Sequence, residues 1–289
     1  MHNDAYAALF ARQLIASLEE MGIHVFPDLN TCWHYDDKVG QKYLLEAIGA
    51  PLVPTHIFYD RAEALAWAET ASFPKVWKLR GGAGSQNVRL VRTREQARRH
   101  INRSFGRGWG HDRFAALKER IWHLRRDRSW ASFLAIARGV GRAIVPHAKH
   151  RHGGVERNYA YFQDFVPGND FDIRVVTIGN RAFAIKRHTR DGDFRASGSG
   201  RIAYDMREIP VDCIALSFKI SDRLAAQSMA YDYVFRDGEI LLVEISYAFS
   251  VAGYRDCPGF WDRKLNWHED IVRPEAYMIE DVLTAIGHG

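Results

Sequence analysis

The chain has 289 residues, 47% hydrophobic and 26% charged, which is typical of a folded globular protein and excludes a disordered chain or a coiled coil. Its 40 Lys and Arg exceed its 35 Asp and Glu, and no window approaches 18 uncharged apolar residues, so no membrane span is expected. The three cysteines are far apart, which excludes a cysteine-rich zinc site or a disulfide scaffold and favours a reducing compartment. The N-terminus shows no basic start followed by an apolar run, so we expect a cytoplasmic enzyme.

The net charge of +5 is unevenly distributed. Between Arg92 and Arg157 there are 17 basic and 5 acidic side chains, a net charge of +12, and the rest of the chain is acidic. The overall charge therefore describes one segment and does not identify a nucleic-acid-binding protein.

The first third of the chain predicts alternating helices and strands. Apolar spacing predicts helices over 4–21, 37–48, 61–70 and 93–103, and strands over 23–26, 53–58, 75–79 and 87–91. Gly22 and Gly49 are suited to end the first two helices, and Asp60 is suited to cap the third. Thr93 and Gln96 form a capping-box pattern at the start of the fourth.

The rest of the chain predicts antiparallel hairpins around a basic insertion. Residues 104–157 are expected to contain basic amphipathic helices over 112–126 and 129–140. Strands are then expected over 160–165, 171–178, 182–187, 231–235 and 239–245, and helices over 211–227 and 275–286. This order predicts an α+β fold and disfavours a doubly wound parallel sheet.

A glycine-rich turn follows Lys78 in the stretch FPKVWKLRGGAGSQNVRLV. Gly81, Gly82 and Gly84 allow the backbone to approach phosphate oxygens, and Lys78 could add a charge. The stretch is not a Walker A loop, since no GK[ST] follows the glycines. The alternative is a flexible hairpin tip, and the sequence leaves the two equal.

Two carboxylates flank the turn Arg236-Asp237-Gly238. With a three-residue loop, Asp232 falls opposite Leu242, and Asp232, Glu244 and Ser246 share one face; a two-residue loop would separate the carboxylates. Paired carboxylates on one face suit Mg²⁺. A salt bridge to a nearby arginine explains them equally well.

Cations form the third signal. They are Lys38, Arg174, Lys186, Arg187 and Arg195, the last in the loop RDGDFRASGSG. Converging strands favour an anion site, whereas solvated surface charges are the general alternative.

Taken in order, five motifs resemble the ATP-grasp superfamily, most closely its RimK-like ligases. They are YDDKVGQKYLLEAIGAPLVPT, the Lys78 glycine hairpin, YFQDFVPGNDFDIRVV, AIKRHTRDGDFRASGSG and AYDYVFRDGEILLVEIS. The resemblance implies an ATP-grasp fold, with two α+β subdomains clasping ATP between antiparallel sheets. It further implies a remnant N-terminal subdomain (1–34) and an ATP-grasp domain (35–289), with a lid over about 70–165 and a C-terminal catalytic subdomain over 166–289.

The resemblance also implies roles for individual residues. Lys38, Lys78 and Lys186 would contact ATP with the glycine loop above them, Gln163, Asp164, Phe165 and Val166 would form the adenine hinge, and Asp170 or Asp172 would hold the ribose. Arg174, Arg187 and Arg195 would meet the γ-phosphate and the acyl phosphate. Asp232, Glu244 and Ser246 would hold Mg²⁺, or Mn²⁺ in its place, although Ser246 stands where RimK-like enzymes usually have Asn.

The resulting expectation is an Mg²⁺-dependent carboxylate–amine ligase that releases ADP and phosphate, with an acidic sugar or peptide of surface-polysaccharide biosynthesis as a candidate substrate. Two alternatives are an ATP-grasp kinase acting on a hydroxyl and a non-enzymatic binder of an anionic polymer. The basic segment 104–157 would face an anionic acceptor, an anionic membrane surface or solvent. Nucleic acid is not expected as a partner, and the sequence does not define the oligomeric state.

Overall fold

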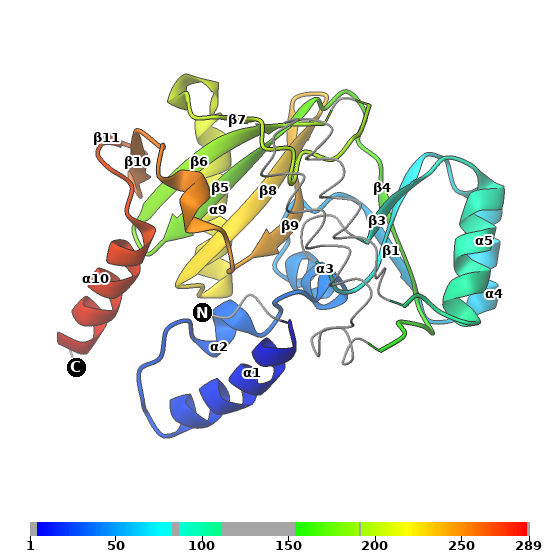
Figure 1. The fold of residues 1–289 in the computed structure, drawn as a ribbon, viewed down its shortest axis with the longest axis horizontal. Helices are drawn as coiled ribbons and strands as arrows, with labels where there is room; N and C mark the ends of the chain where they lie inside the picture. The colour runs from blue at the N-terminus through cyan, green and yellow to red at the C-terminus, as the bar shows by residue number, and fades with distance from the viewer. Residues whose placement is uncertain (1–4, 83–86, 111–153, 191, 288–289) are drawn as a thin grey trace, which may run out of the picture. The chain divides into compact units, whose positions relative to one another are not determined.

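The computed structural model describes residues 5–82, 87–110, 154–190 and 192–287 (Figure 1). Its helices are α1 (Ala5–Glu20), α2 (Leu29–Cys32), α3 (Lys38–Ala47), α4 (Arg61–Thr70), α5 (Arg94–Phe105), α9 (Val211–Leu224) and α10 (Pro274–Gly287), with 3-10 turns η1 (Met206–Glu208) and η2 (Val251–Tyr254). Its strands are β1 (Thr55–Phe58), β2 (Lys75–Lys78), β3 (Val88–Val91), β4 (Ala160–Asp164), β5 (Phe171–Ile178), β6 (Arg181–His188), β7 (Ile202–Ala203), β8 (Ser228–Arg236), β9 (Glu239–Ser246), β10 (Gly259–Asp262) and β11 (Trp267–Glu269). Gly84 and the helices predicted over 112–126 and 129–140 lie outside the described residues.

The strands form two sheets. The smaller has the order β1-β4-β2-β3, and the larger has the order β11-β10-β6-β5-β8-β9, with β7 paired to β6. The pairings in the larger sheet are antiparallel. The predicted α+β class is confirmed.

The larger sheet has two different faces. On one face, Ile173, Val175 and Tyr231 pack in a core cluster with α9, whose apolar residues Ile214 and Phe218 are buried. Strand alternation directs the neighbouring residues of β5, β6 and β8 to the other face. There, Val176 and Phe183 belong to a second, smaller core cluster. Asp172, Arg174, Arg187, Asp232 and Glu244 lie on this second face.

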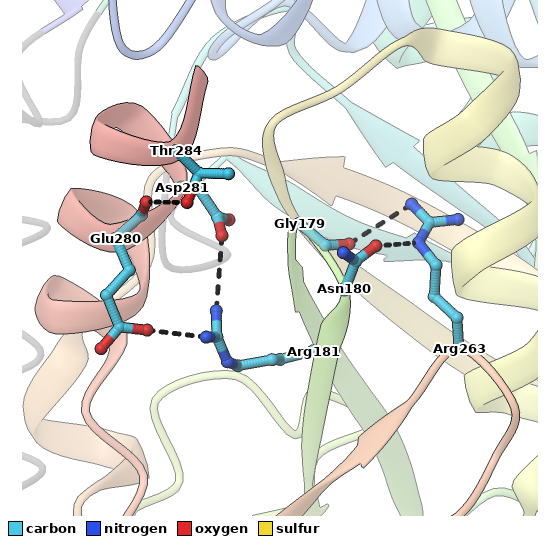
Figure 2. A network of polar contacts seen from close by, with 7 residues as sticks. All are labelled: Gly179, Asn180, Arg181, Arg263, Glu280, Asp281 and Thr284. Carbon is cyan, nitrogen blue, oxygen red and sulfur yellow. Dashed lines mark hydrogen bonds and ion pairs between the residues drawn. The ribbon is translucent and has the colours of Figure 1, made fainter. Parts of the chain in front are cut away.

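Helix α10 is attached to the β5–β6 turn by polar contacts (Figure 2). Arg181 on β6 forms ion pairs with Glu280 at 2.6 Å and Asp281 at 3.4 Å. At the turn itself, Gly179 has φ +52°, and a Cβ there would lie 2.2 Å from Asp281 Oδ2. The turn therefore requires both the left-handed backbone and the small volume of glycine.

The described chain divides into two compact units. The first comprises Met1–His56, Lys75–Leu90 and Phe162–Gly289, and the second comprises Ile57–Pro74 and Val91–Tyr161. In the second unit, α4 packs on α5 through the buried residues Ala64, Ala68, Ala97 and Ile101. No helix within the described ranges is long and apolar enough to cross a membrane.

Two expectations from sequence are wrong. Residues 23–26 form no strand, because the side chain of Gln227 binds this stretch: it donates to Val25 O at 3.1 Å and accepts from Asp28 N at 2.8 Å. The β8–β9 loop has two residues, since Arg236 pairs with Glu239. Asp237 and Gly238 both have positive φ, as a two-residue hairpin turn requires.

Candidate active site

The β8–β9 hairpin brings two carboxylates together by an unexpected route. Asp232 is opposite Glu244, whereas Tyr233, and not Asp232, is opposite Leu242. Val243 is therefore an extra residue, a β-bulge that restores the common face that a two-residue loop would otherwise remove. The common face was predicted correctly, but for the wrong loop length.

The same face carries two oppositely charged cross-strand pairs. Asp172 lies opposite Arg187 on the β5–β6 ladder, and Arg174 lies opposite Asp232 on the β5–β8 ladder. Arg187 donates to both oxygens of Asp172, at 2.7 and 2.6 Å. Asp232 forms ion pairs with Arg187 and Arg174, both at 3.0 Å. Directly opposed opposite charges stabilise a ladder and fix the orientation of the side chains.

Glu244 differs from the other two carboxylates. Within the described part of the chain it has no hydrogen bond and no ion pair within 4 Å. Burial opposes its ionisation, but the charges of Lys38, Lys78 and Arg174 outweigh burial and lower the pKa of Glu244. It is therefore an ionised carboxylate with free oxygen ligands.

Asp172, Arg187, Asp232 and Glu244 line one cavity, which lies entirely within the first unit, whereas Arg174 is outside its lining. Its charged lining consists of Lys78, Asp164, Asp172, Arg187, Arg195, Asp232 and Glu244. Its apolar lining consists of Val53, Val76, Val88, Phe165, Val166, Phe171, Phe194, Ala196, Val234 and Val243. Such a lining suits a ligand with a planar apolar part, which would contact the valine and phenylalanine side chains, and an anionic part, which would contact the cations.

Lys78 is a buried cation of this cavity. It ends β2, where every residue is buried. Burial lowers the pKa of Lys78 to about 8, although Glu244 acts in the opposite direction. The buried ammonium is suited to an anionic ligand, which would replace the missing solvation.

Residues 36–38 contact the beginning of the glycine stretch. Lys38 is the first residue of α3, and its Nζ donates to Gly82 O at 2.9 Å. Gly82 N donates to Asp36 Oδ1 at 2.7 Å. No sequence pattern indicated Asp36, because its left-handed backbone (φ +53°) cannot be inferred from residue spacing.

The predicted hinge residues have distinct environments. Gln163 donates to Thr55 Oγ1 at 3.1 Å and Val243 O at 3.3 Å, and Asp164 pairs with Lys75 at 2.6 Å. The backbone N–H groups of Phe165 and Val166 have no partner among the described residues. Free backbone groups beside an apolar lining are suited to a heterocyclic base.

Other predicted residues lie outside the cavity lining. Asp170 is exposed, and Ser246 donates to Ala248 O at 2.9 Å. Lys186 is on the opposite sheet face from Arg187 and pairs with Glu208 at 2.7 Å. Arg195 does line the cavity and is held by Asp193, with Nη2 to Oδ2 at 2.5 Å.

No sequence-family model and no curated protein matches this chain, but solved structures do. It is similar to D-alanyl-alanine synthetase A from Vibrio cholerae O1 biovar eltor str. N16961, with a TM-score of 0.56 and 10% identity, over 96% of this chain and 72% of that chain. It is similar to the ATP-grasp ligase PsnB complexed with minimal precursor, with a TM-score of 0.53 and 14% identity, over 96% and 69%. A third is the Hydrogenobacter thermophilus 2-oxoglutarate carboxylase biotin carboxylase domain, complexed with MgADP and bicarbonate, with a TM-score of 0.51 and 15% identity.

The chain has the ATP-grasp fold, as its motifs predicted. The match to the carboxylase covers 83% of this chain but 46% of that one, so the chain spans less than half its length.

Proposed function

We propose that this protein is an Mg²⁺-dependent ATP-grasp ligase of the RimK-like type, acting in the cytoplasm. It activates a carboxylate as an acyl phosphate and joins it to an amine, releasing ADP and phosphate. The observation that carries the proposal is Glu244, an ionised carboxylate without an ion-pair partner among the described residues, beside Asp232 in a cavity that also contains Lys78 and Arg187.

The residues in and beside the cavity are suited to the separate parts of ATP. The apolar residues and the free N–H groups of Phe165 and Val166 are suited to adenine, and Asp172 is suited to the ribose. Lys78 and Lys38 supply positive charge for the phosphates. Compact ammonium groups suit this role because they act as point charges.

The carboxylates fit one magnesium ion more readily than two. Glu244 has free oxygens, whereas Asp232 is already paired with Arg174 and Arg187. Glu244 would therefore be the main protein ligand, with Asp232 contributing when it gives up an arginine. Magnesium held there would supply positive charge that neutralises the phosphates.

The arginines supply fixed positive charge where the transferred phosphoryl group must lie. Burial opposes the charge of Arg187, but Asp232 and Asp172 outweigh it and raise its pKa, so Arg187 stays protonated. Its two contacts with Asp172 hold the guanidinium in place before a ligand arrives. Such preorganised charge stabilises a phosphoryl-transfer transition state without a protein nucleophile.

The ligase chemistry rests on the similar structures and not on the cavity alone. One is a D-alanyl-alanine synthetase and another is an ATP-grasp ligase solved with a minimal precursor. For this chain we propose a carboxylate on an acidic sugar or a peptide as the substrate to be activated.

The test is a screen of carboxylate and amine pairs for ADP release, with free phosphate measured in parallel. Glu244→Gln should reduce ADP release by more than about 100-fold, because even groups that only orient metal ligands are worth about 10- to 100-fold. Glu239→Gln is the matched control, since Glu239 is exposed on the same strand. Phosphate retained on the acceptor would instead identify a kinase, and equal rates for both variants would refute the metal role of Glu244.

A further inference from the structure

The stretch from Asp36 to Lys38 is bonded to the stretch from Arg80 to Gly82 by four contacts, which we call the Asp36–Lys38 clamp. Two involve the backbone of Gly82: its N–H donates to Asp36 Oδ1 at 2.7 Å, and its carbonyl oxygen accepts from Lys38 Nζ at 2.9 Å. The others join Lys38 N to Arg80 O at 2.9 Å and Arg80 Nη2 to Asp37 Oδ2 at 2.6 Å. Three consecutive residues thus bind one short segment from a distant part of the sequence.

The backbone at Asp36 explains how three neighbours can do this. Asp36 has φ +53°, a left-handed conformation that most side chains avoid but that Asp and Asn tolerate. Directly after it, Asp37 caps α3 by accepting from Gly40 N at 2.9 Å. The left-handed backbone at Asp36 therefore lets its carboxylate accept from Gly82 N, while the Asp37 carboxylate caps α3 and accepts from Arg80.

The clamp lies next to the charges of the site. Lys38 and Glu244 both act electrostatically on Asp36, whose pKa is raised by burial. Lys38 also acts on Lys78 and Glu244. An ammonium has three donors, and Gly82 O takes one of those on Lys38. The clamp therefore fixes the Lys38 ammonium near Lys78 and Glu244, and its other donors have no partner among the described residues.

We infer that Asp36 is a positioning residue that holds Gly82, and through Gly82 the ammonium of Lys38, in the arrangement that receives the phosphates. This inference rests on the proposed function for its nucleotide part only. The bond from Gly82 N to Asp36 exists without a nucleotide and is measurable without one.

Two substitutions separate the acceptor oxygen from the backbone requirement. Asp36→Asn keeps a side-chain oxygen that accepts from Gly82 N and tolerates positive φ. Asp36→Gly keeps the backbone freedom but removes the acceptor. Asp237→Gly is the matched control, because Asp237 also has positive φ (+51°) but is exposed in the β8–β9 turn.

The first measurement is amide hydrogen exchange of the nucleotide-free full chain, read on peptides that contain Gly82. Asp36→Gly should accelerate exchange there by about ten-fold or more, the effect of losing a hydrogen bond to a charged acceptor. Asp36→Asn should stay close to the wild type, and Asp237→Gly should leave these peptides unchanged. Unchanged exchange in Asp36→Gly, equal acceleration in Asp36→Asn, or acceleration throughout the protein would each overturn the positioning role.

The second measurement is the affinity for Mg·AMPPNP by calorimetry. Asp36→Gly should weaken binding by about ten-fold, and Asp36→Asn should restore most of it. Equal affinity in Asp36→Gly and the wild type would refute the link from Gly82 to the phosphates. If the wild type itself does not bind Mg·AMPPNP, the proposed function fails, whereas the exchange experiment still decides the clamp.

Discussion

Lys78 connects burial to pH dependence at the scale of a single residue. Burial lowers its pKa to about 8, so its positive charge is complete below pH 7 and is lost as the pH rises through 8. Since the charge is needed for an anionic ligand, affinity should fall on the alkaline side.

We predict that the Kd of wild-type protein for Mg·AMPPNP rises about five-fold between pH 8 and pH 9, as expected when only the protonated lysine binds. Lys78→Arg should remove this rise, because arginine stays charged throughout the range. Calorimetric titrations at several pH values check both. The same alkaline rise in Lys78→Arg would assign the pH dependence to another group.

The residues that line the cavity were easier to predict from sequence than the partners of their charged groups. Lys78, Arg187, Arg195, Asp232 and Glu244 line one cavity, as the motifs indicated. The partners of some charges were not predictable: the ion pair of Arg174 with Asp232 depends on the register between β5 and β8, which no hairpin turn connects. The bound roles of these residues stay predictions.

At the scale of elements, the residues of the β5–β6 turn are connected to two helices, α9 and α10. Gly179 must have positive φ and leaves room for Asp281 of α10 (Figure 2). Arg263 donates to Asn180 Oδ1 and to Asp222 of α9, both at 2.7 Å. The turn therefore ties α9 and α10 to the same end of the sheet.

Gly179→Ala should destabilise the protein by about 2–4 kcal/mol, of which about 1–2 kcal/mol is the cost of a left-handed alanine and the remainder is displacement of Asp281. Gly238→Ala is the control, since Gly238 has φ +85° in a hairpin turn with nothing within 4 Å of its added Cβ. Urea unfolding gives both values. Equal costs for the two substitutions would show that the contact with Asp281 is unimportant.

Most elements followed from local sequence signals. Asp60 accepts from Glu63 N at 2.9 Å, and Thr93 accepts from Gln96 N at 3.3 Å, as their capping patterns predicted. The failures occurred where a distant side chain decides the structure. Gln227, about 200 residues away in the sequence, binds residues 25 and 28 and leaves no strand there.

At the scale of the whole molecule, His34 links folding to acidity. It is fully buried, and neither ring nitrogen has a hydrogen-bond partner within the described residues. Burial lowers its pKa to about 4 from an ordinary value of 6.5. As the pH falls, His34 is protonated in the unfolded chain near pH 6.5 but in the folded protein only near pH 4. The free energy of unfolding therefore decreases as the pH falls from 6.5 toward 4.

We predict that His34 alone removes about 2 kcal/mol of the free energy of unfolding between pH 7 and pH 5. In His34→Phe, which cannot titrate, the loss over this range should be smaller by that amount, measured by urea unfolding at the two pH values. The exposed His24 provides the control, since His24→Phe should keep the wild-type dependence. An unchanged dependence in His34→Phe would contradict the prediction.

The bulge at Val243 affects which strand register the β8–β9 hairpin adopts during folding. A hairpin that grows regularly from the Asp237-Gly238 turn would bring Val243 opposite Asp232 and Glu244 opposite Tyr231, on the face that packs against α9. That slipped pairing would bury a carboxylate in an apolar core, which is strongly unfavourable. The charge of Glu244 therefore disfavours the slipped hairpin register. Replacing Glu244 with an apolar residue would remove this energetic penalty as well as a metal ligand.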